Sequence, residues 1–335
     1  MSKILCAGSA GKDIFFPTKE GQIIETPKDL TSQKKIAFEL GEKYKIGQRH
    51  EALGGCAANV AVGLVKLGIE ASCVSQIGDD EIGKWIRQEL QKNKVNVDML
   101  ATQAGKKSDM SAIVVDETSA DRVIFSNKNS SGKIELNKEK IQEAEWILLG
   151  DIHGKWKEQM GTIFQLADNY QKRVAFNPRG SHIREDPAEI IEAIALCEIV
   201  FVNKDEAIEI VSSMHNDVSF EMMNNEKFLL EKLSKLEPKV VVLTDGERGA
   251  WASNGKNIFY SPAEKVKAVD STGAGDSFLA GFLAAYIKEK EIIDCLKWGI
   301  VNSASEVQYF GAIDGLLEEK EIIEKAQNIK TETIQ

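Results

Sequence analysis

The stretch DSTGAGDSF at residues 270–278 decides how the rest of the sequence is interpreted. A strand-like segment leads into it, and the spacing of Phe278, Phe282 and Tyr286 predicts a helix behind it. Three small residues at 273–275 let a backbone approach a ligand closely. Successive N–H groups at a helix start face an anion, and the helix dipole assists them. The stretch therefore predicts an anion-binding turn between a strand and a helix.

Asp276 stands at the same helix start and has two interpretations. It is a helix cap, the commonest use of Asp before a helix, or it is a general base that takes a proton from a hydroxyl while the neighbouring N–H groups hold a phosphoryl group. The local pattern leaves both open. The stretch is not a Walker A loop, because GxxxxGK[ST] is absent. Residues 8–11 resemble a dinucleotide fingerprint only weakly.

Along the rest of the chain, short apolar runs alternate with helical patterns. Strands that alternate with helices predict an α/β fold: a doubly wound, mainly parallel sheet with helices on both faces. The predicted strands include 3–7, 71–77, 146–149, 173–176, 198–202 and 240–243, and the predicted helices include 57–67, 80–94, 155–171, 187–196 and 226–236.

Two segments interrupt this alternation and are expected to form a small β-rich lid. Residues about 14–50 are polar, with strand-like pieces near 22–25 and 42–47. Residues about 108–130 contain two β-rich runs joined by a polar connection, which predicts a hairpin. We expect one domain over residues 1–335, with a polar tail from about 326 that frays.

Composition excludes several classes of protein. The 335 residues carry 42 basic and 52 acidic side chains, a net charge of −10, which argues against nonspecific nucleic-acid binding. Five cysteines without a Cys-x-x-Cys pattern make neither a disulfide framework nor a structural zinc site. The N-terminus carries no secretion signal, and no run of about 20 apolar residues spans a membrane. We expect a cytoplasmic protein.

The DSTGAGDSF stretch resembles the C-terminal signature of the ribokinase-like (PfkB-type) carbohydrate kinases. GGCAANVA at 54–61 resembles their N-terminal signature, and the resemblance extends from about Lys3 to Leu317. The ordered set of motifs favours the catalytic interpretation of Asp276 over the cap, and it implies a ribokinase-like fold. The further matches, in chain order, are GDDEIG at 78–83, NKDE at 203–206, TDGERG at 244–249 and Gly311-Ala312.

The resemblance implies an ATP-dependent kinase that phosphorylates a hydroxymethyl group on a small sugar. Asp276 matches the base that activates the acceptor hydroxyl, and Gly273, Ala274 and Gly275 match the anion hole. Positioning and charge neutralisation are what phosphoryl transfer requires. Glu206 matches a residue that organises Mg²⁺, although by itself it fits a first-turn acid. The residues that match ATP-binding positions are Asn203, Thr244, Gly246, Gly249 and Gly275.

On the acceptor side, the resemblance implies a carboxylate after the first strand that binds substrate hydroxyls, at Asp13. Gly55 and Asn59 match the part of the N-terminal signature that contacts the acceptor, and an Asn amide both donates to and accepts from adjacent hydroxyls. Asp151, with His153, follows a buried strand where some relatives place an acceptor-binding side chain. Arg179 can reach a phosphate or an acidic acceptor, or lie in a surface loop.

The sequence also departs from ribokinases themselves. Cys56 replaces a Lys and Gly11 replaces an Asn, so two polar groups that would hold ribose are missing. Asp270 and Thr272 match positions that help bind a monovalent cation in some relatives, but residues 306–310 depart from the potassium-dependent pattern. Enzymes with and without a K⁺ requirement both fit.

Three alternatives stay open. A nucleoside kinase would need an aromatic base pocket, for which Phe15, Phe16 and Phe38 are candidates. A phosphosugar kinase would need basic residues near the acceptor, such as Lys12 and Arg179. A non-catalytic sugar or nucleotide sensor is expected to have lost the base or the anion hole by substitution, but both are intact here. A homodimer through the lid is a further expectation, because exposed sheet edges invite pairing.

Overall fold

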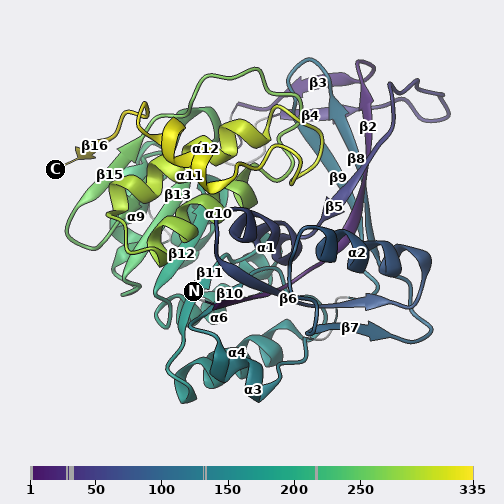
Figure 1. Ribbon diagram of the computed structural model, residues 1–335. Coiled ribbons are helices and arrows are strands. Elements are labelled where there is room, and N and C mark those ends of the chain that lie inside the picture. Colours follow the sequence, from purple (N-terminus) through teal and green to yellow (C-terminus); the bar gives the residue numbers. More distant parts are fainter. Residues whose placement is uncertain are drawn as a thin grey trace.

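A ten-stranded sheet runs through the computed structural model, which describes residues 3–27, 29, 34–130, 132, 134–215 and 218–334 (Figure 1). From β13 to β7 the strands are parallel, and β14, β15 and β16 continue the sheet in antiparallel fashion. Their order is β16 (Glu332–Ile334), β15 (Ile258–Ser261), β14 (Ala250–Ser253), β13 (Val240–Thr244), β12 (Ile199–Asn203), β11 (Arg173–Phe176), β10 (Trp146–Leu149), β1 (Lys3–Ala7), β6 (Glu70–Gly78) and β7 (Leu100–Gln103).

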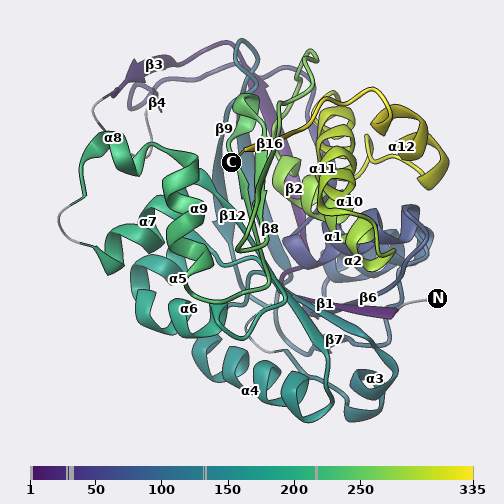
Figure 2. The same cartoon turned by 90° about the vertical axis from the view of Figure 1, so that its left-hand side faces the viewer.

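Helices cover both faces of this sheet, as Figure 2 shows edge-on. The central strands are continuous apolar runs because both of their faces are buried. Along β1, Ile4 and Cys6 pack into one core and Leu5 and Ala7 into the other. The predicted doubly wound α/β fold is confirmed. One face carries α1 (Cys56–Lys66), α2 (Glu81–Lys92), α10 (Ala274–Ile287), α11 (Ile292–Glu306) and α12 (Glu319–Ala326); the other carries α3 (Lys138–Glu143), α4 (Trp156–Asn169), α5 (Gly180–Glu185), α6 (Pro187–Ile194), α7 (Lys204–Met214), α8 (Phe220–Met223) and α9 (Glu226–Ser234).

A second sheet stands beside the first (Figure 1); it takes strands from both segments expected to form the lid, but the first segment begins earlier, at Gly11, and extends later, to Gly54. In it, β2 pairs in parallel with β8 and antiparallel with β5, and β8 pairs antiparallel with β9. A separate ribbon pairs β3 with β4. The bounds are β2 (Gly11–Thr18), β3 (Gln22–Glu25), β4 (Lys34–Ala37), β5 (His50–Gly54), β8 (Asp109–Asp116) and β9 (Arg122–Asn127).

Two local expectations are wrong. Residues 42–47 form no strand; β3 instead pairs with β4, where Ile23 lies opposite Ile36. The polar end of the chain does not fray over residues 332–334, because β16 pairs with β15 and extends the sheet. The partner of β16 is distant in sequence, so the local polarity of the tail does not reveal the pairing. The partner of β3 is near in sequence, but the polar run KKIA of β4 does not suggest a strand.

Two glycines let α10 and α11 approach closely. A Cβ on Gly281 would lie 2.6 Å from the Trp298 carbonyl oxygen, and a Cβ on Gly299 would lie 2.7 Å from the Phe278 ring. Neither site has room for a methyl group. This close packing fixes α10, whose first turn carries the DSTGAGDSF stretch.

We therefore expect Gly281→Ala to destabilise the protein by about 1–3 kcal/mol, because an added methyl group overpacks the helix contact. The matched control is Gly161→Ala in α4, an exposed glycine with no atom within 4 Å of an added Cβ. It should stabilise by about 0.4–1 kcal/mol. Urea unfolding followed by circular dichroism measures both, and equal effects of the two variants would contradict this account of the α10–α11 contact.

Candidate active site

The carboxyl ends of five adjacent strands meet at one edge of the main sheet. Because β1, β10, β11, β12 and β13 are parallel neighbours, the residues that follow them gather at this edge, where open α/β sheets bind ligands. Ser9 follows β1, Asp151 follows β10 and Arg179 follows β11. Glu206 follows β12 and Thr244 ends β13.

The first turns of α1 and α10 meet at the same place. The Asn59 side-chain Nδ2 donates to Oδ2 of Asp276 over 2.8 Å. Burial raises the pKa of Asp276, and the Asn59 hydrogen bond and the Arg179 charge oppose this effect. The helix begins after Gly273 and has no side-chain cap, so the carboxylate of Asp276 does not cap it. Oδ1 of the buried Asn59 has no partner within the part of the chain described.

The small residues before Asp276 form an open, sharply turned cradle. Gly273 has φ +93°, and a Cβ there would lie 2.3 Å from that of Ala312. Gly275 is exposed, with nothing within 4 Å of an added Cβ. The Ala274 N–H donates to the Ser271 carbonyl (3.3 Å), which leaves the N–H groups of Gly275 and Asp276 at the start of the helix without an intrahelical acceptor. This geometry fits a phosphate.

Asp151 and Arg179 form the second charged group at the edge. The Arg179 Nη2 lies 2.6 Å from Oδ2 of the buried Asp151, and the Ser9 N–H donates to Oδ1 over 3.1 Å. Burial favours the neutral acid, but the charges of Arg179, His153 and Lys128 outweigh it and hold the pKa of Asp151 well below its usual range. Asp151 is therefore an ionised anchor.

Asp13 and Gly55 lie on the acceptor side that the sequence predicts. The buried Asp13 fills the space beside Gly54, where an added Cβ would meet its carboxylate. Burial raises the pKa of Asp13 to about 6; Asp276 and Asp270 add to the effect, and Ser111 and Lys128 oppose it. Gly55 has φ +94°, and a Cβ there would come within 2.5 Å of the Ser9 carbonyl.

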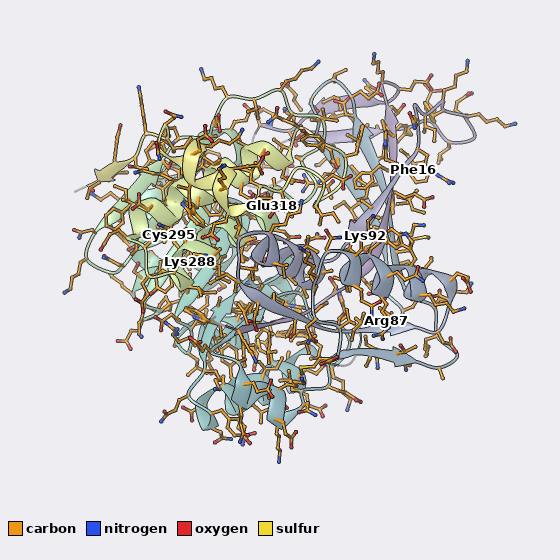
Figure 3. The ribbon with its side chains drawn as sticks, viewed as in Figure 1. Phe16, Arg87, Lys92, Lys288, Cys295 and Glu318 are labelled. Atoms are coloured by element: carbon orange, nitrogen blue, oxygen red, sulfur yellow. The ribbon has the colours of Figure 1, made fainter. Side chains whose placement is uncertain are left out.

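Two groups of side chains named as candidates for specificity point elsewhere. Lys12 alternates with Asp13 along β2, and its Nζ lies 2.5 Å from Glu51 and over the Trp85 ring. Lys12 is thus engaged away from Asp13. Phe15 is fully buried against Phe310, and Phe38 packs on Tyr44 at the surface. Phe16, labelled at the edge of the molecule in Figure 3, alternates with Phe15 along β2 and is partly exposed on the opposite face of the second sheet.

The nucleotide-side residues sit at two neighbouring strand ends. Asn203 and Glu206 form a capping box: Asn203 Oδ1 accepts from the Glu206 N–H, and Glu206 Oε2 accepts from the Asn203 N–H. Burial raises the pKa of Glu206 to about 7, opposed by the Asn203 N–H and Arg179. Next to them, Gly246 is exposed, and Gly249 has φ +98° and no room for a Cβ beside the Ser261 carbonyl.

Sequence reasoning missed two side chains at this site. Arg122 of β9 donates to the Ser271 hydroxyl over 2.7 Å and so joins the second sheet to the cradle loop. Glu306 is fully buried behind Gly273, and its Oε1 has no partner among the described residues. Burial, Asp270 and Asp276 raise its pKa well above the ordinary value. In the sequence, the only signals for these two residues were that Arg122 begins a predicted strand and that Glu306 is an acid at the end of an apolar segment.

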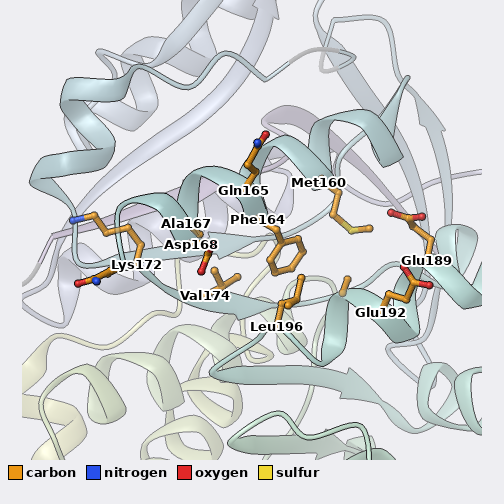
Figure 4. Close-up of a pocket in the computed structure, with 13 residues that line it drawn as sticks. Met160, Phe164, Gln165, Ala167, Asp168, Lys172, Val174, Glu189, Glu192 and Leu196 are labelled. Carbon is orange, nitrogen blue, oxygen red and sulfur yellow. The ribbon is translucent and has the colours of Figure 1, made fainter.

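A surface hollow of about 490 Å³ lies apart from this site, between α4 and α6 (Figure 4). Met160, Phe164 and Leu196 line it, together with Glu189 and Glu192, and no predicted site residue does. In the described ranges, no helix is long and apolar enough to cross a membrane, and no three acidic, His or Cys side chains cluster as metal ligands.

Comparisons with known proteins agree with this architecture. The chain is 27% identical to a fructokinase from Klebsiella pneumoniae over 250 residues, 71% of this chain and 78% of the relative. It is 26% identical to an ATP-dependent 6-phosphofructokinase from Thermoanaerobacterium thermosaccharolyticum over 313 residues, 90% and 92% of the two chains. A nucleoside kinase from Methanocaldococcus jannaschii shares the fold, with a TM-score of 0.75 over 98% of each chain at 21% identity.

The family model of the pfkB family carbohydrate kinases matches residues 28–320. The chain belongs to this family and is a phosphotransferase of the sugar-kinase type, which confirms the resemblance carried by the two signatures. The curated relatives that this chain resembles also include a ribokinase from Schizosaccharomyces pombe, 28% identical over 294 residues, 84% of this chain and 88% of the relative.

The pKa of Asp13 generates a pH prediction for acceptor binding. If the ionised carboxylate accepts hydrogen bonds from acceptor hydroxyls, kcat/KM for the acceptor falls as the pH drops through about 6, because protonation removes that acceptor. Asp13→Asn should lower kcat/KM by about 10-fold to 100-fold, the loss of one hydrogen bond to a charged group, and abolish this dependence.

Initial rates from pH 5 to pH 8 test this expectation. Asp98→Asn is the control, because Asp98 is an exposed acid that precedes the edge strand β7 and is not one of the site residues. A limb near pH 6 that persists in Asp13→Asn would show that another group is responsible.

Proposed function

We propose that this protein transfers the γ-phosphoryl group of ATP to a hydroxymethyl group on a small sugar. The observation that carries the proposal is the hydrogen bond between Asn59 and Asp276 at the mouth of the cradle. It holds a carboxylate of raised pKa within one helical turn of the anion-binding N–H groups. A base and an anion hole so close together suit in-line phosphoryl transfer.

In this mechanism Asp276 is the general base. Asn59 donates to Oδ2 and orients the carboxylate, which takes the proton of the acceptor hydroxyl. Gly273, Ala274 and Gly275 form the anion hole, in which the N–H groups of Gly275 and Asp276 receive the charge that develops on the phosphoryl oxygens. Closure of the second sheet over the site would exclude water and limit ATP hydrolysis.

The nucleotide would lie across the ends of β12 and β13, with Asn203, Thr244, Gly246, Gly249 and Gly275 as its contacts. The half-buried carboxylate of Glu206 fits Mg²⁺, which prefers oxygen ligands and often keeps its waters. Bound there, Mg²⁺ would neutralise phosphate charge. The orphaned Glu306 Oε1 near Asp270 supports a monovalent cation such as K⁺ behind the cradle.

The acceptor would lie between the two sheets, held by Asp13, Gly55 and Asn59, with the ion pair of Asp151 and Arg179 beside it. Carboxylates and an amide accept hydrogen bonds from hydroxyl groups, which favours a neutral polyol.

The nucleoside alternative has less support, because none of its three candidate phenylalanines lines this space. A non-catalytic sensor is disfavoured by the intact base and cradle. Five free, buried cysteines fit an enzyme of the reducing cytoplasm.

Asp276→Asn should retain ATP binding and lose at least about 1,000-fold in kcat, because the amide cannot accept the hydroxyl proton. The measurement is ADP release from Mg·ATP across ketoses, aldoses, phosphosugars and nucleosides. Asp294→Asn is the matched control, a first-turn aspartate of the next helix, α11. Turnover of Asp276→Asn near that of the parent protein would refute the assigned base.

We also propose a homodimer through the second sheet. Every residue of β9 is exposed, including Ile124 at 46% and Phe125 at 62%. A second copy would cover this apolar strand. Light scattering should give twice the mass of the chain for the parent protein and the monomer mass for Phe125→Ser. A parent protein that stays monomeric at all concentrations would contradict the dimer.

A further inference from the structure

Arg179 has a place in the sheet that the proposed mechanism has not yet used. It follows β11, which lies between β10 and β12. The strand order therefore puts Arg179 between Asp151, which follows β10, and Glu206, which follows β12. Asp151 belongs to the proposed acceptor side, and Glu206 belongs to the proposed nucleotide side. The group that crosses from one side to the other is the phosphoryl group.

Asp151 fixes one end of the Arg179 guanidinium. The Asp151 side chain has no exposed surface, and Ser9 donates to it from both its N–H and its hydroxyl, at 3.1 Å and 2.6–2.7 Å. His153 Nε2 lies 3.4 Å away. An ionised carboxylate held this firmly makes a rigid anchor for the guanidinium, which it contacts over 2.6 Å.

The rest of the guanidinium remains available to a ligand. Arginine has five N–H donors in a planar fork, and the bond to Asp151 is the one side-chain hydrogen bond that Arg179 makes within the described ranges. Its side chain is 48% exposed, although the partner carboxylate is fully buried. Full burial of a guanidinium would cost desolvation free energy, which the half-exposed Arg179 side chain largely avoids. Here the structure buries the anchor and presents the cation.

The electrostatic reach of Arg179 covers both halves of the site. Its charge lowers the pKa of Asp276 and also that of Glu206, although burial raises both overall. It opposes the rise in the pKa of the Cys56 thiol as well. A single cation thus acts on the proposed base and on the proposed Mg²⁺ residue, in agreement with its place between two strand ends.

We infer that Arg179 is a catalytic residue whose guanidinium, anchored by Asp151, binds the phosphoryl oxygens during transfer. This rests on the proposed function. In the step, the acceptor oxygen forms a bond to the γ-phosphorus, the bond from that phosphorus to the bridging oxygen breaks, and ADP leaves with the electron pair. Asp276 takes the hydroxyl proton. Arg179 exchanges neither protons nor electrons; it stabilises charge on the equatorial oxygens, which its planar fork can bind in pairs.

An anionic group on the acceptor itself is the rival ligand for Arg179. Within the described residues, two carboxylates without a paired cation stand together on the acceptor side, on Asp13 and Asp276, and the charge of Asp276 contributes to the raised pKa of Asp13. Both carboxylates would repel an acceptor that carries a permanent negative charge. The transferring phosphoryl group instead approaches from the positive end of α10. The two ligands predict different kinetics, because a transition-state contact changes kcat and an acceptor contact changes the acceptor KM.

The test is steady-state kinetics of Arg179→Ala and Arg179→Lys with saturating Mg·ATP and the best acceptor of the parent protein. We expect kcat of Arg179→Ala to fall by about 100-fold to 1,000-fold, the range of one transition-state charge contact, with acceptor KM within about threefold. Arg179→Lys should recover little, since an ammonium cannot form the fork. Added guanidinium ion should raise kcat of Arg179→Ala at least about 10-fold by refilling the site.

Two further variants separate catalysis from folding. Removal of Arg179 alone leaves Asp151 buried without its cation, which can unfold the protein. Asp151→Asn/Arg179→Met removes both charges at similar size, and it should melt cooperatively while kcat stays as low as in Arg179→Ala. Arg184→Ala is the matched control: Arg184 lies on α5, the helix that Arg179 precedes, pairs with Glu209 and is exposed, so its loss should leave kcat unchanged.

The inference is overturned if folded Arg179→Ala keeps kcat within about threefold of the parent value, or if its defect lies only in the acceptor KM. Asp276→Asn run beside it separates the two claims. A parent protein without turnover on any acceptor, or an active Asp276→Asn, overturns the proposed function and this inference with it. An inactive Asp276→Asn beside an active Arg179→Ala overturns the inference alone.

Discussion

The hydrogen bond from Asn59 to Asp276 joins two helix starts that lie 217 residues apart in the sequence. It forms only if α1 and α10 pack side by side, and a Cβ on Gly63 of α1 would lie 2.6 Å from the Cβ of Ala280. The close contact between α10 and α11 at Gly281 and Gly299 holds the same helix from its other side. The parallel sheet beneath supplies the common edge at which these helix starts meet.

The protonation state of each acid at this edge depends on its hydrogen-bond and charge partners and not on its residue type. Asp151 and Asp13 are both buried aspartates, yet their pKa values shift in opposite directions. Asp151 has Arg179 and two donors from Ser9. Asp13 faces other carboxylates, so burial dominates. Two buried aspartates therefore have different roles: Asp151 anchors a cation, and Asp13 has a pKa close enough to neutral pH to gain or lose a proton.

Much of the fold and part of the site could be predicted from the sequence, where local pattern carried the information. Continuous apolar runs indicated strands buried on both faces, and the C-terminal signature at 270–278 placed Gly273 and Asp276 on one turn. Side-chain direction and long-range partners could not be predicted. Lys12 turns to Glu51, and Arg122 bonds to a loop 149 residues away. The capping box of Asn203 and Glu206 shows that one pair of residues can cap a helix and still match a ligand motif.

The central claim is that this site transfers a phosphoryl group to an acceptor hydroxyl group and does not merely hydrolyse ATP. The phosphorus NMR spectrum of the reaction mixture, recorded with proton coupling for the acceptor that releases most ADP, tests it most directly. The account predicts one new phosphomonoester resonance, equal in amount to the ADP formed and split by the two protons of a hydroxymethyl carbon. Inorganic phosphate appearing in step with ADP, and no phosphomonoester, would contradict it.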